Sequence, residues 1–191
     1  MMSVPNSPPA VEPVSLEQAR AHLRVAGCLE DELIAALITS ARIHLEIATR
    51  RMFITQGWSV FLDEWPEGGV ITLAIRPVQS VDSVILHAES GAAREIEPAD
   101  YTADTGSLPR LRPRSGRQWP RPDKPFRGIE IEITAGYGDA PEDVPQPLRQ
   151  AILQLVAHWY ENREPVALGD HAFEIPAMIN ALVAPYRIMA L

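Results

Sequence analysis

The sequence predicts an α+β fold in which a helical frame carries an inserted small antiparallel β-sheet. Three observations lead to this class. Apolar residues recur at helical spacing near both ends of the chain, they alternate with polar residues in the middle, and glycine and proline turns separate the alternating segments. With 191 residues and 46% apolar content, the chain can bury one substantial core. We therefore expect residues 15–174 to form a single domain.

The N-terminal part is predicted to contain a flexible arm and then two helices. The two helices together span residues 15–52. Residues 1–14 hold four prolines and little apolar content, which is typical of a flexible arm. Ser15 should open the first helix, because Ser15 and Gln18 have the spacing of a capping box, and Gly27 should end it. A longer helix is expected over residues 30–51. Its apolar face would consist of Leu33, Leu37, Ala41, Leu45 and Ala48, with Ile34 and Ile38 widening it.

Residues 53–143 are predicted to form the β insertion. Alternation around Val60, a turn at residues 66–69 and a second alternating run at residues 70–75 predict a hairpin. Further strands are expected at residues 81–87, 94–97 and 128–134, with a short one at Tyr101. The isoleucines of residues 128–134 alternate with glutamates and a threonine, so one face of the sheet should lie in water.

A long helix over residues 144–164 is predicted to be the spine of the core. Pro145 and Pro147 fit its first turn, where a missing N–H costs little. Its apolar face comprises Leu148, Ile152, Leu155, Val156 and Trp159. We expect this face to pack against the helix of residues 30–51.

Residues 175–191 are predicted to form a separate C-terminal docking segment. A short amphipathic helix, interrupted near Pro185, is indicated by Ile175, Met178, Ile179, Leu182 and Val183. The end of the chain is also apolar. A helix this short is marginal alone in water, so its apolar side chains require a partner surface.

Residues 108–127 form the one strongly basic segment, with seven basic residues, a single acid and five prolines. Three interpretations fit it: a solvated loop, a protein-docking loop, or a contact with the DNA backbone. The candidate subunit or ring contacts are Arg110, Arg112, Arg114, Arg117, Trp119 and Arg121.

Motifs of catalysis are missing from the sequence, so we expect a protein that is not an enzyme and has no cofactor. There is no phosphate-binding glycine loop and no nucleophile elbow. His158 with Glu161 and His171 with Glu174 lack the second histidine of a zinc motif, and the single Cys28 cannot form an internal disulfide, so no metal site is expected. The net charge of −8 argues against general nucleic-acid binding. No apolar run reaches the roughly 20 residues of a membrane span.

Several short motifs, in this order, resemble the head-tail connector (adaptor) proteins of long-tailed phages, prophages and gene transfer agents. The resemblance covers nearly the whole chain from Ser15. The motifs are Tyr101-Thr102, Trp119-Pro120, the run from Ile131 to Gly138, Val144-Pro145, the run from Ala151 to Glu164, and Pro185-Tyr186-Arg187.

The resemblance implies a structural, non-enzymatic ring, commonly a dodecamer, made in the cytoplasm of a bacterial host and built into the head-tail junction of a virion or phage-like particle. Its partners would be the portal protein and a stopper or tail-completion protein, with DNA passing through its channel without sequence-specific binding, and no membrane. The C-terminal segment would dock on the portal. The candidate docking residues are Ile175, Met178, Ile179, Leu182, Val183, Pro185, Tyr186, Arg187, Ile188 and Leu191. The alternatives are a DNA-processing or DNA-binding factor that uses residues 108–127, and a soluble assembly factor.

Overall fold

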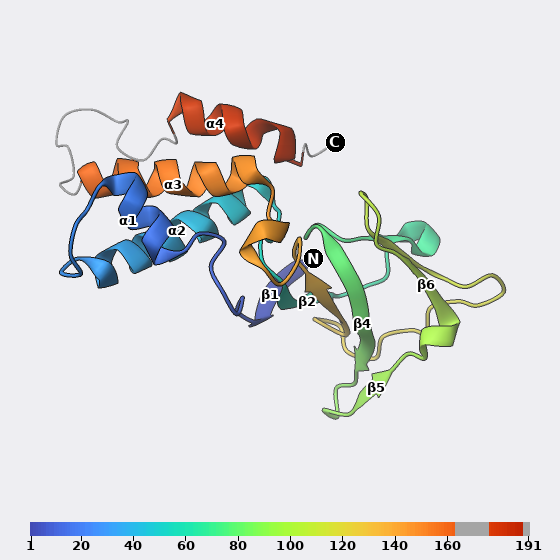
Figure 1. Ribbon diagram of the computed structural model, residues 1–191. Coiled ribbons are helices and arrows are strands. Elements are labelled where there is room, and N and C mark those ends of the chain that lie inside the picture. The colour runs from blue at the N-terminus through green and yellow to red at the C-terminus, as the bar shows by residue number, and fades with distance from the viewer. Residues whose placement is uncertain (163–175, 189–191) are drawn as a thin grey trace, which may run out of the picture. The chain divides into compact units, whose positions relative to one another are not determined.

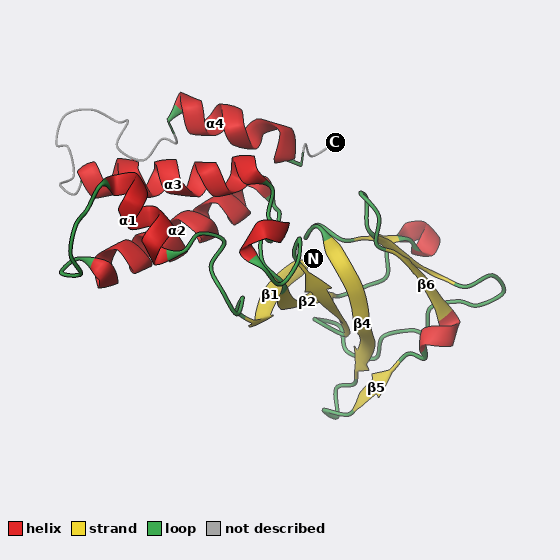
Figure 2. Ribbon diagram, in the orientation of Figure 1, coloured by secondary structure: helices red, strands yellow, loops and turns green. Residues whose placement is uncertain are grey.

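The computed structural model describes residues 1–162 and 176–188 (Figure 1). It contains helices and antiparallel sheets, which confirms the predicted α+β class (Figure 2). The chain divides into two compact units, each assembled from two separate stretches. A β unit contains residues 1–10 and 55–137, and a helical unit contains residues 11–54 and 138–191. The chain therefore passes between the units three times.

The helical unit is organised around α3. Its helices are α1 (Leu16–Leu23), α2 (Asp31–Thr49), α3 (Gln146–Glu161) and α4 (Ala177–Val183), and a 3-10 turn (Ala184–Tyr186) follows α4. α3 packs against each of the other three helices. Its buried face consists of Leu148, Ala151, Ile152, Leu155 and Val156. Trp159, predicted for the same face, is half-buried.

The predicted capping box at Ser15 is confirmed. The Ser15 hydroxyl accepts from the Gln18 N–H at 3.1 Å, and the Gln18 side chain accepts from the Ser15 N–H at 3.1 Å. α1 ends earlier than expected, because Arg24 takes the left-handed conformation that closes the helix.

The apolar face predicted for α2 is confirmed in part. Its members Ile34, Ile38, Ala41 and Leu45 are buried, whereas Leu33 is 39% exposed. The buried and exposed members all have helical spacing, so the period of the sequence cannot separate them. Packing against α3 decides which of them are buried.

Five strands of the β unit form one antiparallel sheet in the order β1-β2-β8-β4-β5. They are β1 (Met2–Ser7), β2 (Gln56–Leu62), β4 (Val78–His87), β5 (Ala93–Glu95) and β8 (Ile129–Ala135). β8 is central, and its Ile131 lies opposite both Val60 and Val84 on the apolar face. On the other face, Glu132 lies opposite Ser59 and Ser83. The sheet therefore has the alternation that the sequence indicated.

A second sheet contains three short strands in the order β3-β7-β6. These are β3 (Ile71–Thr72), β6 (Tyr101–Asp104) and β7 (Arg110–Pro113). Short 3-10 turns at Glu67–Gly69, Pro98–Asp100 and Pro141–Asp143 complete the described elements.

Three details of the strand prediction were wrong. The hairpin expected around residues 66–69 does not form, because β2 pairs with β1 and β8 while β3 pairs with β7 in the other sheet. Residues 2–7 are an edge strand where an arm was expected, since backbone pairing with β2 does not require apolar side chains. Arg110–Pro113 is a strand inside the segment that was read as irregular.

Candidate functional site

Potential metal-binding groups and membrane-spanning helices are both absent from the part of the chain that the structure describes. Within residues 1–162 and 176–188, no three His, Cys, Asp or Glu side chains gather into a group that could hold a metal ion. No helix in these ranges has the length and apolar character to cross a bilayer. His171 and Glu174 lie outside the described residues. The candidate sites are therefore surfaces.

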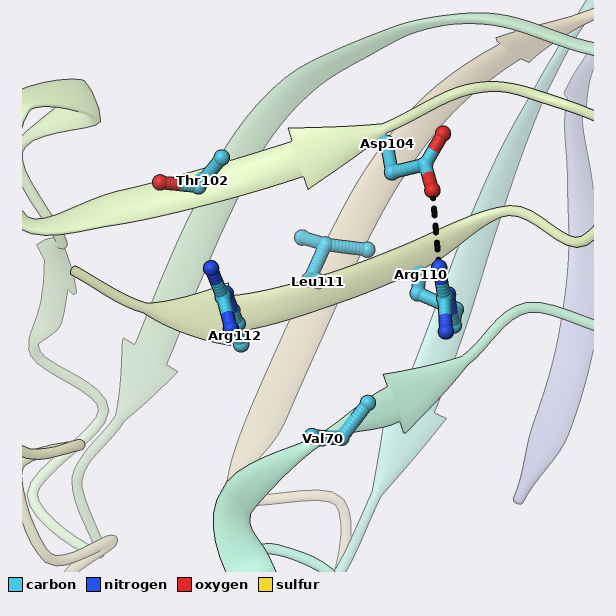
Figure 3. A pocket seen from close by; sticks show the side chains of 6 residues that line it. All are labelled: Val70, Thr102, Asp104, Arg110, Leu111 and Arg112. Carbon is cyan, nitrogen blue, oxygen red and sulfur yellow. Dashed lines mark hydrogen bonds and ion pairs between the residues drawn. The ribbon is translucent and has the colours of Figure 1, made fainter. Parts of the chain in front are cut away.

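The basic segment begins on β7, in the three-stranded sheet of the β unit. Arg110 and Arg112 are exposed on one face of this strand, and Leu111 between them is fully buried on the other. Figure 3 shows the hollow that lies over this face, with a volume of about 290 Å³. Its walls are Val70, Thr102, Asp104, Arg110, Leu111 and Arg112. The hollow thus presents two guanidinium groups and one carboxylate beside a small apolar wall.

Asp104 neutralises one of these guanidinium groups. Arg110 Nη2 lies 3.0 Å from Asp104 Oδ2, and the Gly106 N–H donates to Asp104 Oδ1 at 3.0 Å. The Gly106 hydrogen bond, followed by the Arg110 bond and charge, lowers the pKa of the Asp104 carboxyl below its ordinary value. The Arg110 guanidinium is therefore already paired with a carboxylate of its own sheet.

The other arginines of the segment differ in their partners. Arg117 Nε lies 3.3 Å from Asp100 Oδ1. The guanidinium groups of Arg112, Arg114, Arg121 and Arg127 are exposed and have no acidic partner among the described residues. Four arginines of the basic segment are therefore not neutralised within the described residues and are available to an acidic partner.

Trp119 holds the basic segment in place. Its ring stacks on Trp65, with centroids 4.4 Å apart and 8° between the planes. Trp119 Nε1–H donates to the Gly69 carbonyl at 2.7 Å, and Trp65 Nε1–H donates to the Pro120 carbonyl at 2.7 Å. Gly69 has φ +71°, which favours glycine, and a Cβ there would lie 3.5 Å from the Trp119 ring. Trp119 was a candidate ring contact, but its ring is used inside the β unit.

The candidate docking residues of the C-terminal segment fall into three groups. Ile179 and Val183 are buried in the helical unit, at 1% and 0% exposure, on α4, which packs against α3. The second set is exposed and consists of Met178, Pro185 and Arg187, together with three half-buried residues, Leu182, Tyr186 and Ile188. Ile175 and Leu191 lie outside the described residues.

The end of the described chain is tied to the helical unit. Arg51 Nε donates to the Tyr186 carbonyl at 2.7 Å, and Arg187 Nη2 donates to the Asn180 side chain at 2.7 Å. The inner face of α4 is thus part of the protomer core. A docking surface on α4 would have to use its outer face, where Met178 is 64% exposed.

A buried charge cluster in the helical unit was missed by the sequence analysis. Arg42 Nε lies 2.8 Å from Glu12 Oε2, and Arg42 Nη1 lies 2.9 Å from Glu46 Oε2. Glu46 Oε1 also accepts the Phe53 N–H at 2.8 Å. Burial alone would lower the pKa of the Arg42 guanidinium. The hydrogen bond to Glu12 and the charges of Glu46 and Glu12 outweigh it, so this pKa is raised.

The i,i+4 spacing of Arg42 and Glu46 could have indicated half of this cluster, because such pairs are neighbours on a helix. Glu12 is thirty positions before Arg42 and gives no local signal. The cluster joins the segment before α1 to α2, and its role is structural.

Solved structures match the chain along its full length. One chain is described as the neck of an empty GTA particle computed with C6 symmetry, with 28% identity and a TM-score of 0.82. Another belongs to the virion of a native gene transfer agent (GTA) particle, with 26% identity and a TM-score of 0.84. A third chain, from the neck of a native GTA particle computed with C12 symmetry, has 28% sequence identity and a TM-score of 0.74. Each match covers 100% of this chain and 97% of the other.

No protein-family model and no curated protein sequence matches the chain. The structural matches confirm the resemblance to the head-tail connector proteins of phage-like particles that the order of the sequence motifs indicated.

Proposed function

We propose that this chain is a structural component of the neck of a tailed phage or gene-transfer-agent-like particle, where its copies form a ring between head and tail. The observation that carries this proposal is the likeness to neck and virion chains over the whole length of both partners. A likeness of this extent includes both the helical unit and the β unit. The place of the protein is thus the phage-like particle, and its role is structural.

The ring is supported by the symmetry of the similar necks, which were computed with C6 and C12 symmetry. Contacts between two different surfaces of identical subunits generate a closed ring when the rotation closes. A dodecamer satisfies both symmetries, since a twelvefold ring also contains sixfold rotations. We propose that DNA passes through this ring without sequence-specific contacts.

We further propose that one end of the ring docks on the portal protein and the other receives a stopper or tail-completion protein. Support for a docking role of the C-terminal segment comes from the outer face of α4, where Met178 is 64% exposed, and from the exposed Pro185 and Arg187 nearby. The buried Ile179 and Val183 would hold α4 in place while its outer face makes the contact.

The unneutralised arginines support a second contact surface. Because the whole chain carries a net charge of −8, four free guanidinium groups on one unit complement the surface of a neighbouring copy or of another acidic protein. Changing Arg112, Arg114 and Arg121 together to Ala should reduce incorporation into particles while leaving the fold intact. Arg110 is left unchanged in this variant because it is paired with Asp104.

The same arginines also favour a second candidate function, a factor that binds the DNA backbone. The two functions differ in their response to salt. Backbone binding by the free protein would fall steeply as salt rises, because each phosphate contact releases counterions. Tight, salt-sensitive binding of duplex DNA by the free chain, lost in the triple Ala variant, would favour the DNA-binding function.

Deleting the gene in a particle-producing cell tests the main proposal. The expected result is heads that lack attached tails in electron micrographs, with tailed particles restored by a complementing copy of the gene. An affinity-labelled chain should appear by gold labelling at the junction of head and tail. Normal tailed particles from the deletion strain would overturn the proposal.

A further inference from the structure

The inference concerns α2, which carries apolar residues on a side where no described element covers them. Leu33, Ile43 and Ile47 are 39%, 45% and 73% exposed, although all belong to a helix whose opposite side lies in the core. Ala36 and Ser40 are exposed between them, and the steps from 33 to 36, 40, 43 and 47 alternate between three and four residues. Such steps place these five residues on one line along the helix. We call this line the α2 stripe.

The α2 stripe contains no charged residue and a single polar one, Ser40. Leu29, which precedes the helix, extends the apolar character and is 99% exposed. Isolated exposed apolar residues are ordinary, but a contiguous series along a helix marks an interaction surface. Two charged residues of the same helix, Arg42 and Glu46, point away from it into the buried cluster with Glu12, and the other two, Asp31 and Glu32, lie in the first turn beside the start of the stripe.

We propose that the α2 stripe is the apolar centre of the contact between neighbouring copies of this chain in the assembled ring. The inference rests on the proposed neck function and assigns that ring a surface. In a ring such as the C12 necks that the chain resembles, every copy has two neighbours. Each copy also carries a formal net charge of −8, so an apolar contact between two copies is favoured where the contact residues themselves carry no acidic group. The α2 stripe meets that condition.

The size of the α2 stripe fits a contact that forms in the ring and not in the free protein. The stripe runs from residue 33 to residue 47 of α2, which is about 21 Å at ~1.5 Å per residue, and a helix is about 10 Å wide. The stripe therefore offers roughly 210 Å², about a quarter of the ~800 Å² that each partner buries in a stable interface. The free chain should accordingly remain monomeric, and copies should associate when the ring supplies further contacts beside the stripe.

Site-specific photo-crosslinking in particles tests this assignment. The photoreactive amino acid p-benzoylphenylalanine is introduced in place of Ile47 in the complementing full-length chain, particles are purified, and the sample is irradiated. The expected product on a denaturing gel is a homodimer at twice the 21.1 kDa chain mass, with both crosslinked peptides assigned to this chain by mass spectrometry. Position 35 is the matched control, because Ala35 is exposed on the same helix but away from the stripe, and should give no homodimer.

The other possible results of the crosslinking experiment contradict either the assignment of the stripe or the proposed function. A crosslink from position 47 to another particle protein, a crosslink confined to one chain, or no crosslink at all would overturn the assignment of the stripe to a second copy. If the chain is present in the particles, the proposed neck function stands in these cases. If the chain is absent from purified particles, the proposed function fails together with the inference.

A pair of charge variants supplies a second measurement. Changing Ile43 and Ile47 together to Glu should lower incorporation into particles at least tenfold, whereas Ala35→Glu should incorporate like the unmodified chain. Circular dichroism of the free variants should be unchanged, because these positions are exposed. Normal incorporation of the double Glu variant would overturn the inference. If this variant misfolds, the photo-crosslinking experiment still tests whether the α2 stripe contacts a second copy.

Discussion

Strands β7 and β8 of the β unit and helix α2 of the helical unit differ in where they place charged and apolar residues. In the β unit, Ile129, Ile131 and Ile133 of the central strand are fully buried, and arginines such as Arg112 are exposed. In the helical unit, the adjacent residues Arg42 and Ile43 show the reverse: the Arg42 side chain is 8% exposed and Ile43 is 45% exposed.

Both units expose some large apolar residues, Phe126 in the β unit and Ile47 in α2 each at 73%, but those of the α2 stripe follow one line along a helix. The buried charge of Arg42 is compensated by Glu12 and Glu46. The exposed apolar groups of the α2 stripe have no such compensation among the described residues. This contrast indicates that an apolar surface is retained for contacts with other molecules, and the following predictions test or refine it.

The largest effect is expected from Arg42→Ala, which tests whether the buried charges stabilise the helical unit. The change leaves Glu46 buried without its cation, and breaking a buried pair in this way costs about 3–5 kcal/mol. Chemical denaturation followed by circular dichroism at a helical wavelength would measure it. Arg112→Ala is the control and should change the free energy of unfolding by less than about 0.5 kcal/mol, because this side chain is exposed. Equal effects of the two changes would remove the contrast between the units.

Leu155→Ala should cost about 2–5 kcal/mol, because Leu155 is 1% exposed in the centre of α3 and its loss leaves a cavity. Ile47→Ala, on the α2 stripe, should cost less than about 0.5 kcal/mol in the free chain. The same denaturation measurement applies to both. A cost below half a kilocalorie for Leu155→Ala would mean that α3 is peripheral to the helical unit.

A smaller effect is expected from Trp119→Ala in the β unit. The aromatic stack on Trp65 contributes about 0.5–1.5 kcal/mol and the hydrogen bond to Gly69 a further 0.5–1.5 kcal/mol or so. Trp fluorescence reports mainly this unit, because three of the four tryptophans, Trp58, Trp65 and Trp119, belong to it and Trp159 belongs to the helical unit. Trp119→Phe keeps a stacked ring but loses the hydrogen bond, so its cost should be intermediate. If Trp119→Ala changed nothing, the basic segment would have to be held by other contacts.

The smallest effect concerns the pH dependence of the hairpin formed by β6 and β7. The Gly106 N–H and Arg110 lower the pKa of Asp104, so ionised Asp104 favours the folded hairpin above its ordinary pKa of about 4. This contribution should be lost as pH falls through the lowered value. An NMR titration of the Asp104 carboxyl would follow it, and Arg110→Gln should raise the pKa partway back. A midpoint at or above the ordinary value would show that these hydrogen bonds do not form in solution.

The parts of the fold that the sequence predicted are those with a local signal. The capping box at Ser15 depends on residues three apart, and α2, α3 and β8 each have a clear period over their own length. The α+β class follows from these elements alone.

Features that depend on distant residues could not be predicted in this way. One of the two partners of β2 is β1, about fifty residues earlier, and Trp119 stacks on a tryptophan more than fifty positions before it. Leu33 of the α2 stripe was predicted to lie on the core face, because it has the same helical spacing as the buried Ala41 and Leu45. The packing of α3 determines which of these residues are buried. The unpaired arginines required the positions of Asp100 and Asp104, which neutralise Arg117 and Arg110 but not the others.

The three passages of the chain between its two units also determine when the protein can fold during translation. The five-stranded sheet lacks its central strand until β8, Ile129–Ala135, has left the ribosome. α2 lacks its main packing partner until α3, Gln146–Glu161, has been synthesised. Neither unit can complete its fold early in synthesis, although domains often fold as units from the N-terminus while the chain is being made. We therefore expect nascent chains to remain open until most of the sequence has emerged, so that completed subunits meet one another only after release.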